Sequence, residues 1–169
     1  MRTVDQDKQA GVIVLYEECH DALILTQRSH QLREHPGEIC FPGGRWQEGD
    51  VDFFATALRE LQEELGIESE RLHSPVLMNT VRTQSGFVIH PWFAKIPHLE
   101  PYQLDCQEVI EVFRLPMADV ENPDNYQPIR VRRGDQDIES YQFATGQRFV
   151  WGATVRIMMQ LTKSSATSK

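Results

Sequence analysis

Hydrophobic and polar positions change their period several times along the chain, and the first change predicts a β-hairpin. An apolar run rich in β-branched residues extends from Gly11 to Tyr16. A second apolar run extends from Ala22 to Leu25 and leads into polar residues 26–28. Because the residues between the two runs are mostly polar, we expect two antiparallel strands joined by a turn.

A long shaped loop and then a helix are expected after this hairpin. Residues 29–38 are polar, and Phe41-Pro42-Gly43-Gly44 is a poor continuation of regular structure. From Asp52 to Leu65 the period changes to that of an amphipathic helix, which Gly66 is well placed to end. The apolar stripe of this helix consists of Phe54, Leu58, Leu61 and Leu65.

The rest of the chain predicts more short strands and a closing helix. The expected strands are residues 76–82, 87–94 and 109–115, with a late hairpin at 130–132 and 139–143 and a helix at 151–161. Strands and helices do not alternate regularly, which indicates an α+β fold with a mixed sheet. We find no internal repeat and no dividing linker, so we expect one domain over residues 9–162, with flexible ends at 1–8 and 163–169.

Three glutamates on the predicted helix are the first candidates for chemistry. Glu60, Glu63 and Glu64 stand at i, i+3 and i+4, so their carboxylates project from one face. Like charges at this spacing repel, and a divalent cation would relieve the repulsion. Oxygen ligands with no histidine one turn away favour Mg²⁺ or Mn²⁺. The same cluster also fits a solvated acidic helix face, but Gly43 and Gly44 allow backbone to approach a metal or phosphate closely.

The same helix carries a motif that resembles the Nudix box. Residues 59–67, Arg-Glu-Leu-Gln-Glu-Glu-Leu-Gly-Ile, match every constrained position of its second half. The first half of the box has Gly, five residues, Glu, seven residues and Arg. Here Asp50 follows Gly44 after five residues, and eight residues separate Asp50 from Arg59. The role of Asp50 therefore stays open.

The residues before this motif resemble the signature of one branch of the family, the coenzyme A diphosphatases. The likeness is carried by Leu25-Thr26-Gln27-Arg28-Ser29, Arg33, Gly37 and Phe41-Pro42-Gly43-Gly44. Members of that branch commonly have an Asp and a longer first half of the box. The match covers residues 23–67 with few interruptions, and weaker similarity continues to residue 154.

The resemblance implies a Nudix α/β/α sandwich around a mixed sheet. It also implies hydrolysis of the diphosphate of coenzyme A or its derivatives to 4′-phosphopantetheine and adenosine 3′,5′-bisphosphate. Carried over by position, Glu60, Glu63 and Glu64 bind Mg²⁺ or Mn²⁺, and the carbonyl of Gly44 completes a site. The catalytic candidates are Glu64, Glu60 and Glu108, with Glu64 or Glu108 favoured as the general base.

Three arginines are candidates for substrate binding. Arg28 and Arg33 precede the acidic helix, and guanidinium groups suit phosphate recognition. An equally good interpretation of Arg28 is an ion pair with a helix carboxylate that fixes the loop. Arg82 could also reach an anion, although a surface arginine beside a turn explains it as well.

Composition narrows the class of partner. The chain has 17 Lys and Arg against 25 Asp and Glu, a net charge of −8, which disfavours broad nucleic-acid binding. Carboxylate-bound metal ions could still attract a small phosphorylated substrate. The three scattered cysteines are typical of a reducing cytoplasm, and no apolar run approaches the roughly 20 residues needed to span a membrane. The sequence leaves open whether the protein forms a homodimer.

Two alternatives to a coenzyme A diphosphatase remain at this point. The first is a Nudix diphosphatase acting on another nucleotide, such as ADP-ribose or a dinucleoside polyphosphate, because fold and motif do not fix specificity. The second is a nucleotide-binding Nudix module without hydrolysis. Retention of Glu60, Glu63 and Glu64 favours an enzyme.

Overall fold

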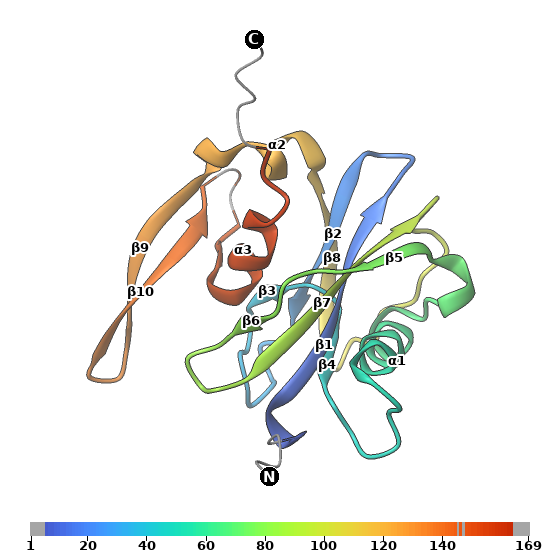
Figure 1. The fold of residues 1–169 in the computed structure, drawn as a ribbon, viewed down its shortest axis with the longest axis horizontal. Coiled ribbons are helices and arrows are strands. Elements are labelled where there is room, and N and C mark those ends of the chain that lie inside the picture. The colour runs from blue at the N-terminus through green and yellow to red at the C-terminus, as the bar shows by residue number, and fades with distance from the viewer. Residues whose placement is uncertain (1–5, 145, 147, 164–169) are drawn as a thin grey trace.

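The computed structural model describes residues 6–144, 146 and 148–163 (Figure 1). Its strands are β1 (Gln9–Glu17), β2 (Ala22–Arg28), β3 (Ile39–Cys40), β4 (Gly43–Arg45), β5 (His73–Leu77), β6 (Val81–Arg82), β7 (Val88–Ile96), β8 (Val109–Pro116), β9 (Tyr126–Arg133), β10 (Gln136–Phe143) and β11 (Val150–Trp151). Its α-helices are α1 (Phe53–Leu65), α2 (Met117–Glu121) and α3 (Gly152–Met159). Three 3₁₀ turns complete the set: η1 (Gln6–Lys8), η2 (Ser69–Arg71) and η3 (Pro123–Asn125).

A mixed eight-stranded sheet lies at the centre of the molecule. The main path runs β3-β2-β1-β7-β5, while β4 pairs with β1, β6 with β7 and β8 with β2. Strands β1 and β7 are parallel, and the other pairs in this sheet are antiparallel. Strands β9, β10 and β11 form a second, three-stranded sheet. The predicted hairpins and the mixed sheet are therefore confirmed.

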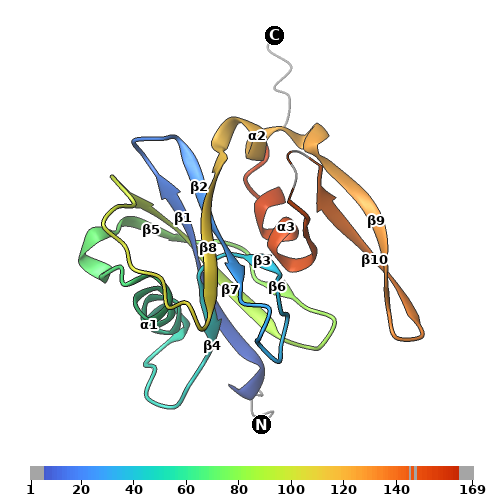
Figure 2. The ribbon, with the colours of Figure 1, turned by 180° about the vertical axis from the view of Figure 1, so that it is seen from behind.

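Helices cover both faces of the central sheet, which makes the α/β/α sandwich that the sequence predicts (Figures 1 and 2). Helix α1 covers one face over a core that includes Ile13, Ile24, Leu61 and Leu65. Helices α2 and α3 lie over the other face, where Leu23, Leu25, Val120, Val155 and Met158 are buried. Figure 1 shows the β9–β10 hairpin reaching outward beyond α3.

Helix α1 begins and ends at the residues that the sequence predicts. The side chain of Asp52 accepts a hydrogen bond from the backbone N–H of Ala55 at 2.7 Å, which satisfies an unpaired N–H of the first turn. Gly66 has φ 64°, a left-handed conformation that glycine adopts without strain, and donates to the carbonyl of Gln62 at 2.8 Å. Both ends of the helix are therefore fixed by local chemistry.

Gly11 lets α1 approach the sheet closely. A Cβ atom at this position of β1 would lie 2.1 Å from the carbonyl oxygen of Phe53, at the start of α1. Backbone atoms cannot move aside as a flexible side chain does, so a larger residue would separate the helix from the strand. The packing distance of the helix that carries the glutamates therefore depends on this glycine.

Two segments differ from the sequence-based expectation. Residues 39–45 contain β3 and β4 instead of only loop, because β2 and β1 offer backbone partners: Thr26 lies opposite Cys40 and Gly11 opposite Gly44. The strand expected at 76–82 is split into β5 and β6. Between these strands, Oε1 of Gln160 accepts a hydrogen bond from the backbone N–H of Asn79 at 3.0 Å, and Nε2 of Gln160 donates one to the carbonyl of Asn79 at 2.9 Å. These two bonds replace those that a partner strand would make.

The ends expected to be flexible are described in part. Residues 1–5 and 164–169 lie outside the described residues. Residues 6–8 form η1, and Lys163 contacts Glu121 through its backbone N–H at 3.0 Å and its ammonium group at 2.9 Å. No helix in the described part of the chain is long and apolar enough to cross a membrane.

Candidate active site

Three carboxylates from two segments meet beside the central sheet. Oxygen atoms of Glu60, Glu64 and Glu108 all lie within 4.8 Å of one another. Glu60 and Glu64 are one turn apart on α1. Glu108 lies just before β8, where its carbonyl accepts a hydrogen bond from the backbone N–H of Ser29 at 2.9 Å. The structure therefore brings together the three residues that the sequence named as catalytic candidates.

Burial and the negative charges of neighbouring carboxylates raise the pKa of each of these carboxyl groups. Burial is the largest cause for all three residues. The pKa of Glu64 is raised furthest, because the charges of Glu60 and Glu108 add to its burial. A hydrogen bond from the backbone N–H of Gly43 opposes that rise. The raised pKa values mean that the nearby arginines do not fully compensate the negative charge of the three carboxylates. A bound hard cation would stabilise them as anions.

Glu63 does not join this cluster. Its side chain is 45% exposed and pairs with Nη1 of Arg59 at 3.3 Å. The carboxylates of Glu60 and Glu64 lie closer to the sheet, where β4 contacts them. The i, i+3, i+4 spacing thus places three glutamates at neighbouring positions of α1. Only Glu60 and Glu64, which face the sheet, lie in the cluster with Glu108.

Strand β4 approaches the cluster through its glycines. A Cβ atom at Gly44 would lie 2.5 Å from Cδ of Glu60 and 2.6 Å from its Oε1. Gly43 has φ 156°, and a Cβ there would lie 2.4 Å from the carbonyl oxygen of Gly11. Only a residue without a side chain leaves the carboxylate of Glu60 where it lies.

Asp50 has a role that the sequence left open. Its Oδ1 accepts a hydrogen bond from Nε of Arg59 at 2.9 Å, and its Oδ2 accepts one from Nη2 at 3.0 Å. The same Oδ2 accepts from Oγ1 of Thr56 at 2.9 Å. The hydrogen bonds from Arg59 are the largest cause that lowers the pKa of Asp50 to about 2. Asp50 therefore holds Arg59, whose Nη1 lies 3.1 Å from Oε1 of Glu60.

Arg28 lies at the end of β2 near the carboxylates, and its charge lowers the pKa of both Glu64 and Glu108. Its Nη2 donates to the carbonyl of Glu34 at 3.1 Å. Its Nε is buried and has no hydrogen-bond partner among the residues that the structure describes. The alternative of a hydrogen-bonded pair between Arg28 and a carboxylate of α1 is not observed there.

Arg33 and Arg82 stand apart from the cluster. Both side chains are exposed. Arg82 takes part through its backbone, whose carbonyl accepts from Nη2 of Arg156 at 2.7 Å. The structure thus gives these two predicted substrate-binding residues no position in the carboxylate cluster.

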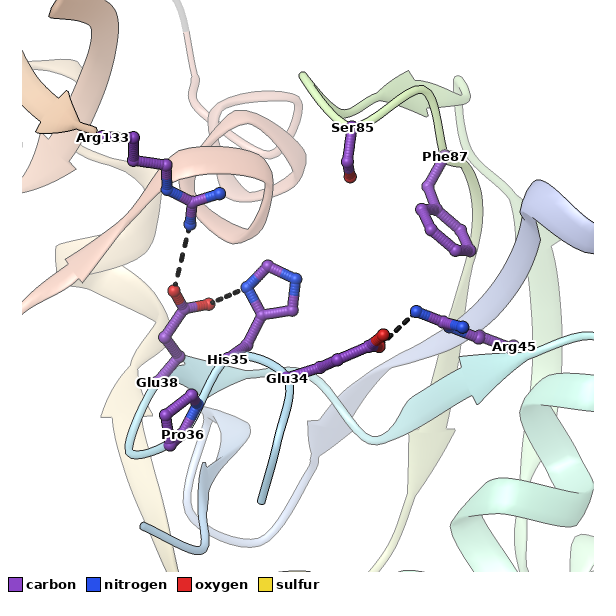
Figure 3. A pocket seen from close by; sticks show the side chains of 8 residues that line it. All are labelled: Glu34, His35, Pro36, Glu38, Arg45, Ser85, Phe87 and Arg133. Atoms are coloured by element: carbon purple, nitrogen blue, oxygen red, sulfur yellow. Dashed lines mark hydrogen bonds and ion pairs between the residues drawn. The ribbon is translucent and has the colours of Figure 1, made fainter. Parts of the chain in front are cut away.

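A pocket of about 470 Å³ is formed by the loop before β3, by β4 and by the segments that carry Ser85, Phe87 and Arg133 (Figure 3). Its lining residues are Glu34, His35, Pro36, Glu38, Arg45, Ser85, Phe87 and Arg133. Arg45 follows Gly44 in β4, so its side chain points to the opposite face of the strand from the one that meets Glu60. Arg28 connects the pocket with the cluster, because its charge lowers the pKa of the lining residue Glu38 as well as those of Glu64 and Glu108. Sequence reasoning missed Arg45 and Arg133 as site residues. The basic run at residues 130–133 was the signal available for Arg133, but nothing in the sequence alone brings it to this pocket.

A second group of metal-ligating side chains, Glu17, Cys19 and His20, is already occupied by protein partners. Arg114 donates to Glu17 through both Nε and Nη2, at 2.5 and 3.0 Å. The backbone N–H of Leu99 donates to the same carboxylate at 2.7 Å. Hydrogen bonds to the anion thus outweigh burial, the largest single influence, and lower the pKa of Glu17 to about 2. This group serves the fold.

Comparison with known proteins gives the same family as the motif. The sequence model of the NUDIX domain family matches residues 7–135 of this chain. An uncharacterized Nudix hydrolase, NudL, from Pectobacterium atrosepticum is 35% identical, over 95% of this chain and 84% of its own length.

Two solved structures agree with the fold. A MutT/nudix family protein from Enterococcus faecalis has a TM-score of 0.63 at 18% identity, over 95% of this chain and 62% of that one. The NUDIX domain of NrtR from Shewanella oneidensis, solved in complex with ADP ribose, has a TM-score of 0.51 at 27% identity. That match covers 66% of this chain and 74% of that one.

Proposed function

Because the chain belongs to the NUDIX domain family, we propose that it hydrolyses the diphosphate of coenzyme A or its derivatives. Members of the family are hydrolases that act on pyrophosphate bonds of nucleotide derivatives. The products of the proposed reaction are 4′-phosphopantetheine and adenosine 3′,5′-bisphosphate. The observation that carries the proposal is the meeting of Glu60, Glu64 and Glu108 within 4.8 Å.

The choice of coenzyme A is supported by the segment that resembles the coenzyme A diphosphatases. Two residues of that segment act on Glu64: Arg28 lies close enough to lower its pKa, and the backbone N–H of Gly43 donates a hydrogen bond to its carboxylate. Gly44 lies against Glu60. Three residues of the motif, Arg28, Gly43 and Gly44, therefore lie near the carboxylates, although they come from β2 and β4.

The donor set fits a divalent cation. Nudix hydrolases generally use divalent metal ions such as Mg²⁺. Crowded carboxylates with raised pKa values are hard oxygen ligands short of positive charge, which suits Mg²⁺ or Mn²⁺. We assign Glu60 and Glu64 as ligands, with the carbonyl of Gly44 as a further donor. Glu63, which the motif also assigns to the ion, would have to leave Arg59 to reach it.

When bound, the ion would polarise the phosphate oxygens and lower the pKa of the attacking water. Side chains of the protein would bind the diphosphate and accept the proton of the attacking water. Arg28 would bind the diphosphate through its guanidinium group, whose buried Nε has no hydrogen-bond partner among the described residues. Glu108 is favoured over Glu64 as the proton acceptor, since Glu64 is only 5% exposed and is bonded to β4.

Substrate profiling tests the proposal. The full chain is incubated with coenzyme A, ADP-ribose and NADH in the presence of Mg²⁺ or Mn²⁺, and the products are separated. We expect turnover of coenzyme A above the other two. Absence of turnover on all three would contradict an enzyme, and preference for ADP-ribose would contradict coenzyme A as the substrate.

Matched variants separate the roles of the glutamates. Glu108→Gln is expected to lower kcat by about 10²- to 10⁴-fold while Mn²⁺ binding, measured by titration, stays unchanged. Glu64→Gln is expected to lose both activity and Mn²⁺ binding. Glu48→Gln, an exposed residue of the loop before α1, is the control. Loss of Mn²⁺ binding in Glu108→Gln would make Glu108 a ligand instead of the base.

ADP-ribose is the second candidate substrate. The favouring observation is the NrtR domain bound to ADP ribose, at 27% identity. Both molecules contain an adenosine diphosphate, so the carboxylate cluster and Arg28 serve either. The comparison of coenzyme A with ADP-ribose above decides between them.

A further inference from the structure

Two arginines from distant parts of the chain face each other across the pocket of Figure 3. Arg45 belongs to β4, and Arg133 ends β9 on the outward-reaching hairpin. The pocket does not contain the carboxylate cluster, and Arg28 lies near enough to both that its charge lowers the pKa of Glu38 in the pocket and of Glu64 and Glu108 in the cluster. A group bound here would therefore belong to the part of a substrate beyond the bond that is cleaved.

Each of these guanidinium groups is held by one carboxylate and has further donors without a partner in the part of the chain that the structure describes. Nη2 of Arg133 lies 3.3 Å from Oε1 of Glu38, whose other oxygen lies 3.1 Å from Nδ1 of His35. Nη2 of Arg45 donates to Glu34. A guanidinium has five N–H donors, so one bond orients it without using the rest. Trp151 supports Arg133 from behind, with its ring centroid 5.1 Å from the guanidinium carbon.

The surroundings of the pocket are more basic than the chain as a whole. Lys8 donates through Nζ to the carbonyl of Ser85, a lining residue, at 3.3 Å. With Lys8, three cationic groups stand near two carboxylates, in a chain whose net charge is −8. An anionic group is therefore a better occupant than a cationic one.

We propose that this pocket binds the phosphomonoester of coenzyme A, the 3′-phosphate, through the free N–H donors of Arg45 and Arg133; this rests on the proposed function. Guanidinium groups bind phosphate oxygens with two parallel hydrogen bonds, which fixes geometry as well as charge. The ring of Phe87, with Arg45 4.6 Å from its centroid, offers apolar surface to the attached nucleoside. The β9–β10 hairpin is then a specificity element, because it brings Arg133 to the site.

Kinetics on a matched pair of substrates test this subsite. 3′-Dephospho-coenzyme A differs from coenzyme A only by the phosphomonoester. Arg133→Ala is expected to raise the KM for coenzyme A about tenfold, to leave kcat within about twofold, and to leave the KM for the dephosphorylated substrate unchanged. Arg133→Lys keeps the charge and is expected to recover part of the loss. Arg130→Ala, an exposed residue of the same hairpin paired with Glu139, is the control.

A binding measurement keeps the test independent of hydrolysis. Wild-type protein is titrated calorimetrically with adenosine 3′,5′-bisphosphate and with AMP, which lacks the 3′-phosphate. We expect tighter binding of the bisphosphate, and loss of that advantage in Arg133→Ala, with unchanged thermal unfolding.

The outcomes separate the subsite from the proposed function. Hydrolysis of coenzyme A with equal effects of Arg133→Ala on both substrates would overturn the subsite alone. Absence of hydrolysis, together with an Arg133-dependent preference for the bisphosphate, would overturn the proposed function and support the subsite. Equal affinity of the wild-type protein for AMP and the bisphosphate would overturn the subsite whatever the substrate.

Discussion

At the scale of the residue, Asp50 and Arg59 show how one ion pair fixes its neighbours. The guanidinium of Arg59 bonds to Asp50, to the carbonyl of Arg45 at 3.1 Å and to Glu60. Arg59 thus joins the helix that carries the carboxylates to the strand that carries Gly44. Asp50 is a positioning residue, since it acts on the cluster only through Arg59.

Replacement of Asp50 tests that role. Asp50→Asn is expected to lower the free energy of unfolding by about 1–3 kcal/mol, because a charge-assisted bond is lost from a half-buried arginine. It is also expected to lower kcat while KM for the substrate changes little, since Arg59 no longer holds Glu60. Urea unfolding and steady-state kinetics measure the two effects, with Glu48→Gln as the control. Unchanged kcat in a destabilised Asp50→Asn would show that the pair serves only the fold.

Gly44 gives a second prediction at this scale. Gly44→Ala places a Cβ about where the carboxylate of Glu60 now lies, so Glu60 must turn away. We expect weaker Mn²⁺ binding with cooperative unfolding retained. Gly134→Ala is the control, because a Cβ there meets no atom within 4 Å, and its positive φ carries the backbone strain alone. Equal Mn²⁺ affinity in Gly44→Ala and the wild-type protein would argue against Glu60 as a ligand.

At the scale of the element, α1 was predictable and the short strands beside it were not. Its apolar stripe, its N-cap at Asp52 and its end at Gly66 are all local signals. Strands β3 and β4 form because β1 and β2 offer partners, and no local pattern reports that. The candidate site was predictable in part for the same reason. The motif predicts Glu60 and Glu64, but the position of Glu63 outside the carboxylate cluster depends on its ion pair with Arg59 and on which side of α1 faces the sheet.

The N-cap of α1 provides a prediction for this element. Asp52→Ala removes the acceptor for the N–H of Ala55 and is expected to cost about 1 kcal/mol of stability. Because Asp52 lies at the far end of the helix from Glu64, hydrolysis is expected to change little. Urea unfolding with Asp52→Asn as the matched variant measures the effect, and a large loss of activity at full stability would contradict it.

At the scale of the whole molecule, Glu17 connects segments that are far apart in sequence. Its side chain is fully buried at the end of β1, where it binds Arg114 of β8 and the backbone of Leu99. Arg114 also pairs with Glu100 at 2.8 Å. Glu17 therefore joins β1 to β8 and to the segment after β7.

The pKa of Glu17 predicts how stability depends on pH. The folded protein lowers that pKa from the usual 4.5 to about 2, so the anion is favoured by folding. Its contribution is therefore complete above about pH 4.5 and is lost as the pH falls toward 2. We expect urea unfolding to show falling stability over this window. Glu17→Gln should be less stable by about 3 kcal/mol at neutral pH and should have a shallower decline below pH 4.5. An equally steep decline would mean that other carboxylates dominate.

The central sheet and the cluster also meet at Gly11. Its missing side chain lets α1 rest on β1, while Glu108 is fixed separately through β2 and β8. Any Cβ at residue 11 would move Glu60 and Glu64 outward together and leave Glu108 behind. The distance between the metal ligands on α1 and the proton acceptor Glu108 is thus determined by a single hydrogen atom on β1.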